Sequence, residues 1–232
     1  MAAVPAIQTR IDELQNSFHD KVDDVMSERD LKRNDIYAAR TKVLKEKGPK
    51  NFWALVIQSH EDVAMELMGP YDATILDSLE DLNVEFTQDG YKLTIKFGRN
   101  DFFEEKELWA EDVDGDMKFS GISWKDGKGP LTEAEEEQAS ASKSGTKRER
   151  DDRGPSLFEV FAEMAPHPEE DEELEEEDDE EIEELVGEWE EDLEDRKEVL
   201  GCLVDEIWAD PASVLAKLPT GKCAEGCTHS HH

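Results

Sequence analysis

An apolar stripe runs through the first 47 residues of the chain. Most of its members are three, four or seven residues apart, which places them on one face of a helix. They are Ile7, Ile11, Leu14, Phe18, Val22, Val25, Ile36 and Val43. Neither Gly nor Pro interrupts the stripe before Gly48-Pro49. Residues 1–48 are therefore predicted to contain one helix that is roughly 60 Å long.

A helix of this length exceeds the size of one small domain. We therefore expect the stripe to pair with a second copy of the chain in a coiled-coil-like homodimer, with the stripe residues as dimerisation contacts. The four-residue step from Phe18 to Val22 is typical of a stutter in a heptad repeat. The alternative interpretation is a helix that packs along its own domain.

Residues 49–125 show first helical and then alternating patterns. NFWALVIQSHEDVAMELM has the apolar spacing of one or two short helices, which Gly69-Pro70 ends. Apolar and polar residues then alternate on both sides of Asp89-Gly90, as is typical of a β-hairpin. A second strand pair is predicted around Asp114-Gly115-Asp116. The fold class predicted for the whole chain is α+β, with a four-stranded antiparallel sheet covered by helices.

The remaining chain divides by composition. We expect a flexible charged loop at 126–153, a lobe helix at 154–166, a disordered acidic segment at 167–181, an acidic amphipathic helix with closing lobe helices at 182–218, and a flexible C-terminus at 219–232. The acidic segment is predicted to be disordered because like charges three and four residues apart disfavour a helix. From Ile182 onward apolar residues recur at helical spacing, ending at Ile207. The alternative is a solvated loop throughout.

The net charge of the chain indicates more about its partners than its length does. The chain of 232 residues has 26 Lys and Arg against 61 Asp and Glu, a formal net charge of -35. Such a balance favours a strongly basic protein partner, and it disfavours naked DNA because phosphates repel carboxylates. No apolar run is long enough to span a membrane or to form a signal peptide, so we expect a soluble intracellular chain. Three cysteines are too few for a disulfide framework.

Several motifs appear in an order that resembles a known family. They are NFW, KFGRNDFFEEKEL, GISWKDGKGPL, SLFEVF and DEIWADP. This order resembles the nucleosome assembly protein family, and it is closest to the SET-like branch of histone chaperones. In contrast to SET-like relatives, which carry a long acidic tail after the lobe, this chain holds its acids between SLFEVF and DEIWADP.

The resemblance implies a homodimer joined by the long helix, with each chain forming a lobe called an earmuff. It implies a histone chaperone that binds H3-H4 and H2A-H2B and supports nucleosome assembly or disassembly, without enzymatic activity or a cofactor. It also implies residence in the nucleus, with shuttling to the cytoplasm, and a histone acetyltransferase or another chromatin factor as a further partner. The alternative function is regulation of an enzyme, as a phosphatase inhibitor or a histone acetyltransferase modulator.

The acidic stretch supplies the predicted histone-binding residues, because it combines dense charge with a neighbouring folded lobe. They are Glu169, Glu170, Asp171, Glu172, Glu173, Glu175, Glu176, Glu177, Asp178, Asp179, Glu180, Glu181, Glu184, Glu188, Glu191, Asp192 and Asp195. A secondary set lies on the predicted lobe, at Glu104, Glu105, Glu107, Asp112 and Asp114. Acids on a strand edge are equally expected as a protection against aggregation.

Three smaller patterns have competing interpretations. A basic cluster of Lys143, Lys147, Arg148 and Arg150 is a nuclear import candidate, although Glu149 interrupts it. The terminal Cys223, Cys227, His229, His231 and His232 match no standard zinc spacing, so no metal site is predicted. Trp124, with Lys125 and Lys128, is interpreted as a core residue rather than a DNA contact. No catalytic motif is present, and a metal-dependent hydrolase is the third and weakest hypothesis.

Overall fold

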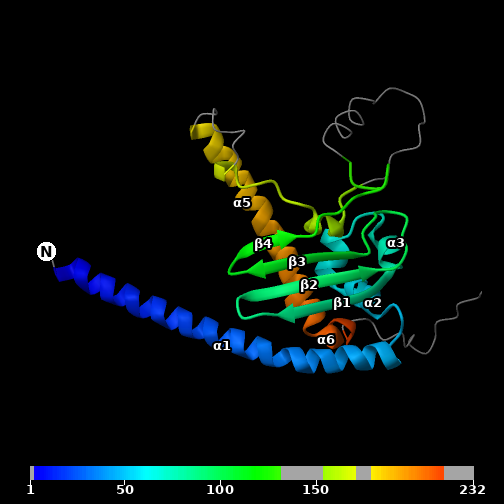
Figure 1. The fold of residues 1–232 in the computed structure, drawn as a ribbon, viewed down its shortest axis with the longest axis horizontal. Helices are drawn as coiled ribbons and strands as arrows, with labels where there is room; N and C mark the ends of the chain where they lie inside the picture. The colour runs from blue at the N-terminus through cyan, green and yellow to red at the C-terminus, as the bar shows by residue number, and fades with distance from the viewer. Residues whose placement is uncertain (1–2, 132–153, 171–178, 217–232) are drawn as a thin grey trace, which may run out of the picture.

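The computed structural model describes residues 3–131, 154–170 and 179–216. A long N-terminal helix lies beside a lobe, and the helices of that lobe cover one face of a four-stranded sheet (Figure 1). This is the α+β architecture that the sequence predicts. Within the described residues, no helix combines the length and the apolar character that crossing a membrane requires.

Helix α1 (Ala3–Lys47) is one continuous helix of 45 residues. Its second half lies along strand β1 (Leu79–Phe86), whereas its first half extends beyond the sheet (Figure 1). The side-chain amide of Asn34 donates to the Phe86 carbonyl at 2.8 Å, and its oxygen accepts from the Phe86 amide at 3.1 Å. Asn34 thereby pairs the backbone of an edge strand that would otherwise face water. The second half of α1 is thus part of the lobe.

The apolar stripe of α1 is exposed to solvent. The exposed fractions of its predicted members are 59% for Ile7, 45% for Ile11, 60% for Leu14 and Phe18, 52% for Val22, 65% for Val25, 67% for Ile36 and 53% for Val43. The first six of these lie on the half that extends beyond the sheet (Figure 1). The alternative of a helix packed along its own domain therefore does not describe this half.

An aromatic cluster joins α1 to the lobe. The guanidinium carbon of Arg40 lies 4.4 Å from the ring centroid of Trp208, and one of its nitrogens donates to the Ala209 carbonyl at 3.2 Å. Trp53 stacks on the same indole at 5.0 Å, and Tyr37 lies 5.8 Å from it. Burial lowers the pKa of the Arg40 guanidinium below its usual value. The cation is thus held by aromatic faces rather than by a carboxylate.

The sheet has the order β1-β2-β3-β4, and all neighbours are antiparallel. Its other strands are β2 (Gly90–Phe97), β3 (Glu107–Val113) and β4 (Asp116–Phe119). The two predicted hairpins are therefore present, with turns at the predicted positions. Gly90 has a φ of +153°, and a Cβ there would lie 2.2 Å from the Asp112 carbonyl oxygen. Only glycine fits this turn without moving the neighbouring strand.

Helices cover one face of the sheet. They are α2 (Phe52–Ser59), the π-helix η1 (Val63–Leu67), α3 (Asp72–Leu76), the 3-10 helix η2 (Leu157–Phe161), α5 (Asp179–Gly201), the π-helix η5 (Cys202–Trp208) and α6 (Pro211–Ala216). The 3-10 helix η3 (Pro168–Glu170) packs against α5. Leu93, Ile95 and Phe97 of β2 point into the core beneath them. Phe158 of η2 is fully buried and lies 5.5 Å from Phe97, ring to ring.

Residues 154–166 contain a shorter helix than predicted. The structure has only the 3-10 helix η2, which begins after the capping residue Ser156. The Ser156 hydroxyl donates to one carboxylate oxygen of the buried Asp72 at 2.6 Å, and the Leu157 amide donates to the other at 2.7 Å. The segment is thus shaped by a carboxylate that is 84 positions away in sequence, which local periodicity could not reveal.

The first residue of the helix in the acidic region also differs from the prediction. Helix α5 begins at Asp179, three residues before the predicted start at Ile182, and it continues into η5 without a break (Figure 1). Most of the segments expected to be flexible or disordered lie outside the described residues. These are most of 126–153, the middle of 167–181, and all of 219–232.

Candidate functional site

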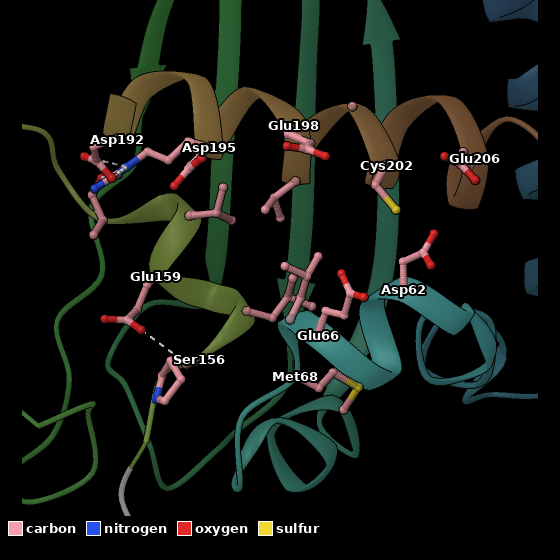
Figure 2. A pocket seen from close by; sticks show the side chains of 18 of the residues that line it. Asp62, Glu66, Met68, Ser156, Glu159, Asp192, Asp195, Glu198, Cys202 and Glu206 are labelled. Carbon is pink, nitrogen blue, oxygen red and sulfur yellow. Dashed lines mark hydrogen bonds and ion pairs between the residues drawn. The ribbon is translucent and has the colours of Figure 1, made fainter. Parts of the chain in front are cut away.

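A groove of about 960 Å³ separates α5 and η5 from η1 and η2. Nineteen described residues line it, and eight of them are acidic. The acidic residues are Asp62, Glu66, Glu159, Asp192, Asp195, Glu198, Asp205 and Glu206. Figure 2 shows α5 and η5 as one wall, with Glu66 and Asp62 facing them from the opposite wall. Helical spacing of three and four residues brings the acids of the first wall onto one side of the helix.

The groove also has an apolar lining. Leu67 and Met68 come from the end of η1, Leu157 and Val160 from η2, and Val199 from α5. Leu157 and Val160 belong to the core and are 4% and 6% exposed. A ligand in the groove would therefore meet carboxylates on both walls and aliphatic surface between them. This combination suits a basic segment that also carries apolar side chains.

Arg196 is the only cation among the described residues that line the groove. Its Nε lies 3.1 Å from both carboxylate oxygens of Asp192, and its Nη1 donates to the Ala162 carbonyl at 2.6 Å. The guanidinium carbon also lies 5.1 Å from the ring centroid of Phe119. Arg196 therefore fixes α5 to the lobe, and it compensates only one of the surrounding acids at close range.

Burial and crowding raise pKa values in the groove. Burial is the main cause that raises the pKa of the Asp205 carboxyl, and Asp30 and Glu206 add to it. Burial likewise raises the pKa of Glu159 above its usual value, with a further contribution from Asp72. Nearby arginines only partly offset these effects, so a further cation that enters the site would favour the ionised form of both carboxyl groups.

The η5 end of the groove contains three potential metal ligands. Among the described residues, His60, Cys202 and Glu206 form a group whose ligand atoms lie within 4.8 Å of one another. His60 is 4% exposed and its Nε2 lies 3.1 Å from a Glu206 carboxylate oxygen. Burial, followed by the charges of Glu206 and Asp62, raises the pKa of the Cys202 thiol to about 11.

Comparison with known proteins places this arrangement in a family. A profile described as Nucleosome assembly protein (NAP) matches residues 44–214, which is well over half of the chain. The chain belongs to the nucleosome assembly protein family. The family that the sequence motifs resemble is therefore confirmed.

Plant members of this family show the likeness in sequence. "NAP1-related protein 2" of Arabidopsis thaliana is 27% identical over 186 residues, which are 77% of this chain and 69% of that protein. "NAP1-related protein 2" of Oryza sativa subsp. indica is 28% identical over 150 residues, which are 61% of this chain and 56% of that protein. The chain thus spans about half to two thirds of the length of the curated relatives it matches.

Solved structures of nucleosome assembly proteins share the fold. "Nucleosome Assembly Protein 1 from Plasmodium knowlesi" has a TM-score of 0.59 at 16% identity and covers 94% of this chain and 95% of its own. The structure of "the Vps75 Histone Chaperone" has a TM-score of 0.50 at 14% identity and covers 93% and 97%. The long helix followed by a four-stranded sheet with helices is therefore the fold of this family.

Within this family member, the predicted histone-binding acids divide into three groups. Asp192 and Asp195 line the groove. Glu181, Glu184, Glu188 and Glu191 are exposed on α5, and Glu169 and Glu170 are exposed on η3, all outside the groove lining. The predicted acids within 171–178 lie outside the described residues, and only the backbone is described for Asp179 and Glu180.

None of the five secondary acids lines the groove, and of these five Glu107 and Asp112 lie on strand β3. Glu107 forms an ion pair with Lys96 at 3.0 Å. Asp112 accepts the Gly115 amide at 2.8 Å, and Glu105 accepts the Ser123 amide at 3.0 Å. Glu105, Glu107 and Asp112 thus form contacts within the lobe itself. The nuclear import candidate at 143–150 and the terminal cysteines and histidines lie outside the described residues.

Six groove acids were not predicted as binding residues. Glu198, Asp205 and Glu206 continue the helical spacing of Asp192 and Asp195, so the same periodicity could have found them. Asp62, Glu66 and Glu159 belong to the opposite wall, and no local pattern pairs them with α5. Trp124 is half-buried and its ring lies 5.7 Å from that of Phe103, which agrees with its interpretation as a core residue.

Proposed function

We propose that this chain is a homodimeric histone chaperone, and that its acidic groove captures a basic segment of a core histone during nucleosome assembly or disassembly. The observation that carries the proposal is the groove lining, with eight carboxylates, one cation already held by Asp192 and Ala162, and an aliphatic surface between the walls. Membership of the nucleosome assembly protein family supports it. No step of this function requires an enzyme or a cofactor.

Many weak contacts suit a protein that must both hold and release histones. Each exposed ion pair contributes at most about 1 kcal/mol. Several pairs along one groove act at a high effective concentration and add up to useful affinity. The Debye length of about 8 Å at physiological salt limits the attraction to nearby charges. Binding by the groove should therefore weaken as salt rises, while its apolar lining retains part of the affinity.

The stripe on α1 supports the homodimer. Six large apolar side chains between Ile7 and Val25 are exposed by 45% to 65% on a helix that leaves the lobe (Figure 1). Pairing with a second copy would remove this surface from water, at roughly 25 cal/mol for each Å² buried. A dimer also presents two acidic grooves at a fixed separation, so a histone oligomer can engage both.

The proposed partners follow from charge. Both H3-H4 and H2A-H2B are strongly basic, so either pair is a ligand for the groove, whereas naked DNA is repelled by a chain with a net charge of -35. A histone acetyltransferase or another chromatin factor is a further proposed partner. Such partners place the chain in the nucleus, with shuttling to the cytoplasm.

The test of this function is a pair of assays on the intact chain. We expect saturable binding of H3-H4 or H2A-H2B at physiological salt, weaker binding as salt rises, and histone-dependent supercoiling of a relaxed plasmid. The supercoiling requires deposited histones, so it separates a chaperone from a passive acidic protein. Absence of histone binding combined with inhibition of a phosphatase would contradict the proposal and favour regulation of an enzyme instead.

A further inference from the structure

The η5 end of the groove combines ligand types that acidic surfaces lack. We propose that His60, Cys202 and Glu206 form a binding site for a thiophilic divalent metal ion, of which Zn²⁺ is the best match. One imidazole, one thiol and one carboxylate meet here from two elements that are 142 positions apart in sequence. A surface cluster of acids alone would carry no such inference, because exposed carboxylates gather in this chain by composition.

The positions of the three donor atoms fit a single ion. The Nε2 atom of His60 lies 3.1 Å from a Glu206 oxygen and 3.9 Å from the Cys202 sulfur. Zn²⁺ binds nitrogen and oxygen at about 2.1 Å and sulfur at about 2.3 Å, so tetrahedral ligands lie about 3.4 to 3.6 Å apart. The Cys202 sulfur and the Glu206 oxygen lie within 4.8 Å of each other, so a rotation of the half-exposed Glu206 side chain would bring the three donors around one ion.

The local backbone explains why the three proposed ligand side chains lie close together. Cys202 and Glu206 are four residues apart on the π-helix η5, where about four and a half residues complete one turn, so both side chains lie on nearly the same side. His60 is the C-terminal capping residue that follows α2, and its ring is buried, with 4% exposure. The imidazole is thus immobilised, while the half-exposed Glu206 and the partly buried Cys202 leave an approach from the groove.

Charge in the neighbourhood favours a cation over the free thiol. Asp62 faces Cys202 and Glu206 from the opposite wall (Figure 2), so two carboxylates lie beside the thiol. Metal binding would release the thiol proton to solvent and replace it with a doubly charged ion beside two carboxylates. Water would complete the coordination of the ion. Sulfur and nitrogen donors select Zn²⁺ over Mg²⁺ or Ca²⁺, which prefer oxygen.

The test uses Co²⁺ as a spectroscopic probe in place of Zn²⁺. The full chain also carries cysteines and histidines near residue 232 that could bind the metal. The reference protein therefore carries Cys223→Ser, Cys227→Ser, His229→Ala, His231→Ala and His232→Ala. We expect this reference to bind one Co²⁺ with a thiolate-to-cobalt charge-transfer band. Zn²⁺ should displace the Co²⁺ and raise the melting temperature. Absence of the band in the reference would contradict the proposal.

Single substitutions in the reference assign the ligands. Cys202→Ser should abolish the band, and Glu206→Gln should weaken Co²⁺ binding by at least about tenfold, because even loss of a residue that only supports a ligand typically costs that much. Glu188→Gln, an exposed change elsewhere on the helix, should leave the affinity unchanged. A band that survives Cys202→Ser would overturn the assignment. Should circular dichroism show that Cys202→Ser unfolds, an unchanged affinity in the folded Glu206→Gln variant would overturn it equally.

Discussion

At the scale of single residues, the lobe is held together by a buried carboxylate. Asp72 is fully buried and accepts three hydrogen bonds, from the Gly69 amide at 2.8 Å, the Ser156 hydroxyl at 2.6 Å and the Leu157 amide at 2.7 Å. It thus fastens η2, which forms part of the groove wall, to the start of α3. In the sequence, Asp72 is one of 61 acidic residues, and no local pattern predicts that it is buried.

Replacing Asp72 with alanine should lower the free energy of unfolding by about 2 to 4 kcal/mol, because two buried amides lose a charged acceptor. Urea denaturation followed by fluorescence measures the change. The exposed Asp77→Asn should change stability by no more than about 0.5 kcal/mol. Equal stability of the two variants would show that Asp72 does not hold η2.

A second residue-scale prediction concerns pH. Burial raises the folded-state pKa of Asp205 above its unfolded value, so the ionised group destabilises the fold at neutral pH. Asp205→Asn should therefore stabilise the protein at pH 7. The gain should shrink as pH falls through the folded pKa, and it should vanish below the unfolded pKa of about 3.9, where both states are protonated. Urea midpoints of variant and parent at several pH values check this, and a gain that grows on acidification would contradict it.

At the scale of elements, α5 shows what periodicity can and cannot predict. The recurrence from Ile182 to Ile207 correctly indicates a helix with an apolar side, and the structure places that side on the lobe. Periodicity states which residues share a face, but it does not state what lies opposite. The second wall of the groove comes from η1 and η2, whose acids meet α5 only through tertiary packing. The periodicity of the sequence therefore predicts one wall of the groove but not the wall formed by η1 and η2.

Two side chains anchor α5 on this lobe. The Trp189 indole N–H donates to the Ala165 carbonyl at 3.0 Å, and its ring lies 4.8 Å from that of His167. Arg196 supplies the other anchor, at Ala162. Because these contacts hold the wall in place, we infer that the geometry of the groove depends on them.

Trp189→Ala should loosen the first part of α5. Amide hydrogen exchange in residues 181–195 should accelerate by about tenfold or more, since an opening free energy reduced by about 1.4 kcal/mol has that effect. Trp189→Phe keeps the ring contact but loses the hydrogen bond, so it should give an intermediate result. Exchange rates that match the parent in both variants would show that Trp189 is not an anchor.

At the scale of the whole molecule, the long helix α1 is the element that the sequence predicts most clearly. Its exposed apolar stripe also favours pairing with a second copy of the chain. Its apolar residues are exposed along the half that leaves the lobe (Figure 1). A single chain cannot cover that half. The dimer, however, remains a prediction, because it concerns a second copy of the chain.

Leu14→Glu combined with Phe18→Glu should convert the dimer to a monomer, since two carboxylates in each chain would enter the interface. Sedimentation equilibrium measures the mass. Glu13→Gln with Asp20→Asn, two changes among the polar residues of the same helix, should leave the dimer intact. A parent protein that already sediments as a monomer would refute the dimer.

We propose that the groove, rather than the total negative charge, captures histones. The decisive measurement compares the affinity for H3-H4 of two variants that each lose three negative charges, at physiological salt. Glu66→Gln, Asp195→Asn and Glu198→Gln change exposed acids of the groove, and Glu80→Gln, Glu85→Gln and Asp101→Asn change exposed acids elsewhere on the lobe. We expect the groove variant to raise Kd by about 10 to 100-fold, since three ion pairs are lost, while the control stays within about twofold. Equal affinities in the two variants would contradict it.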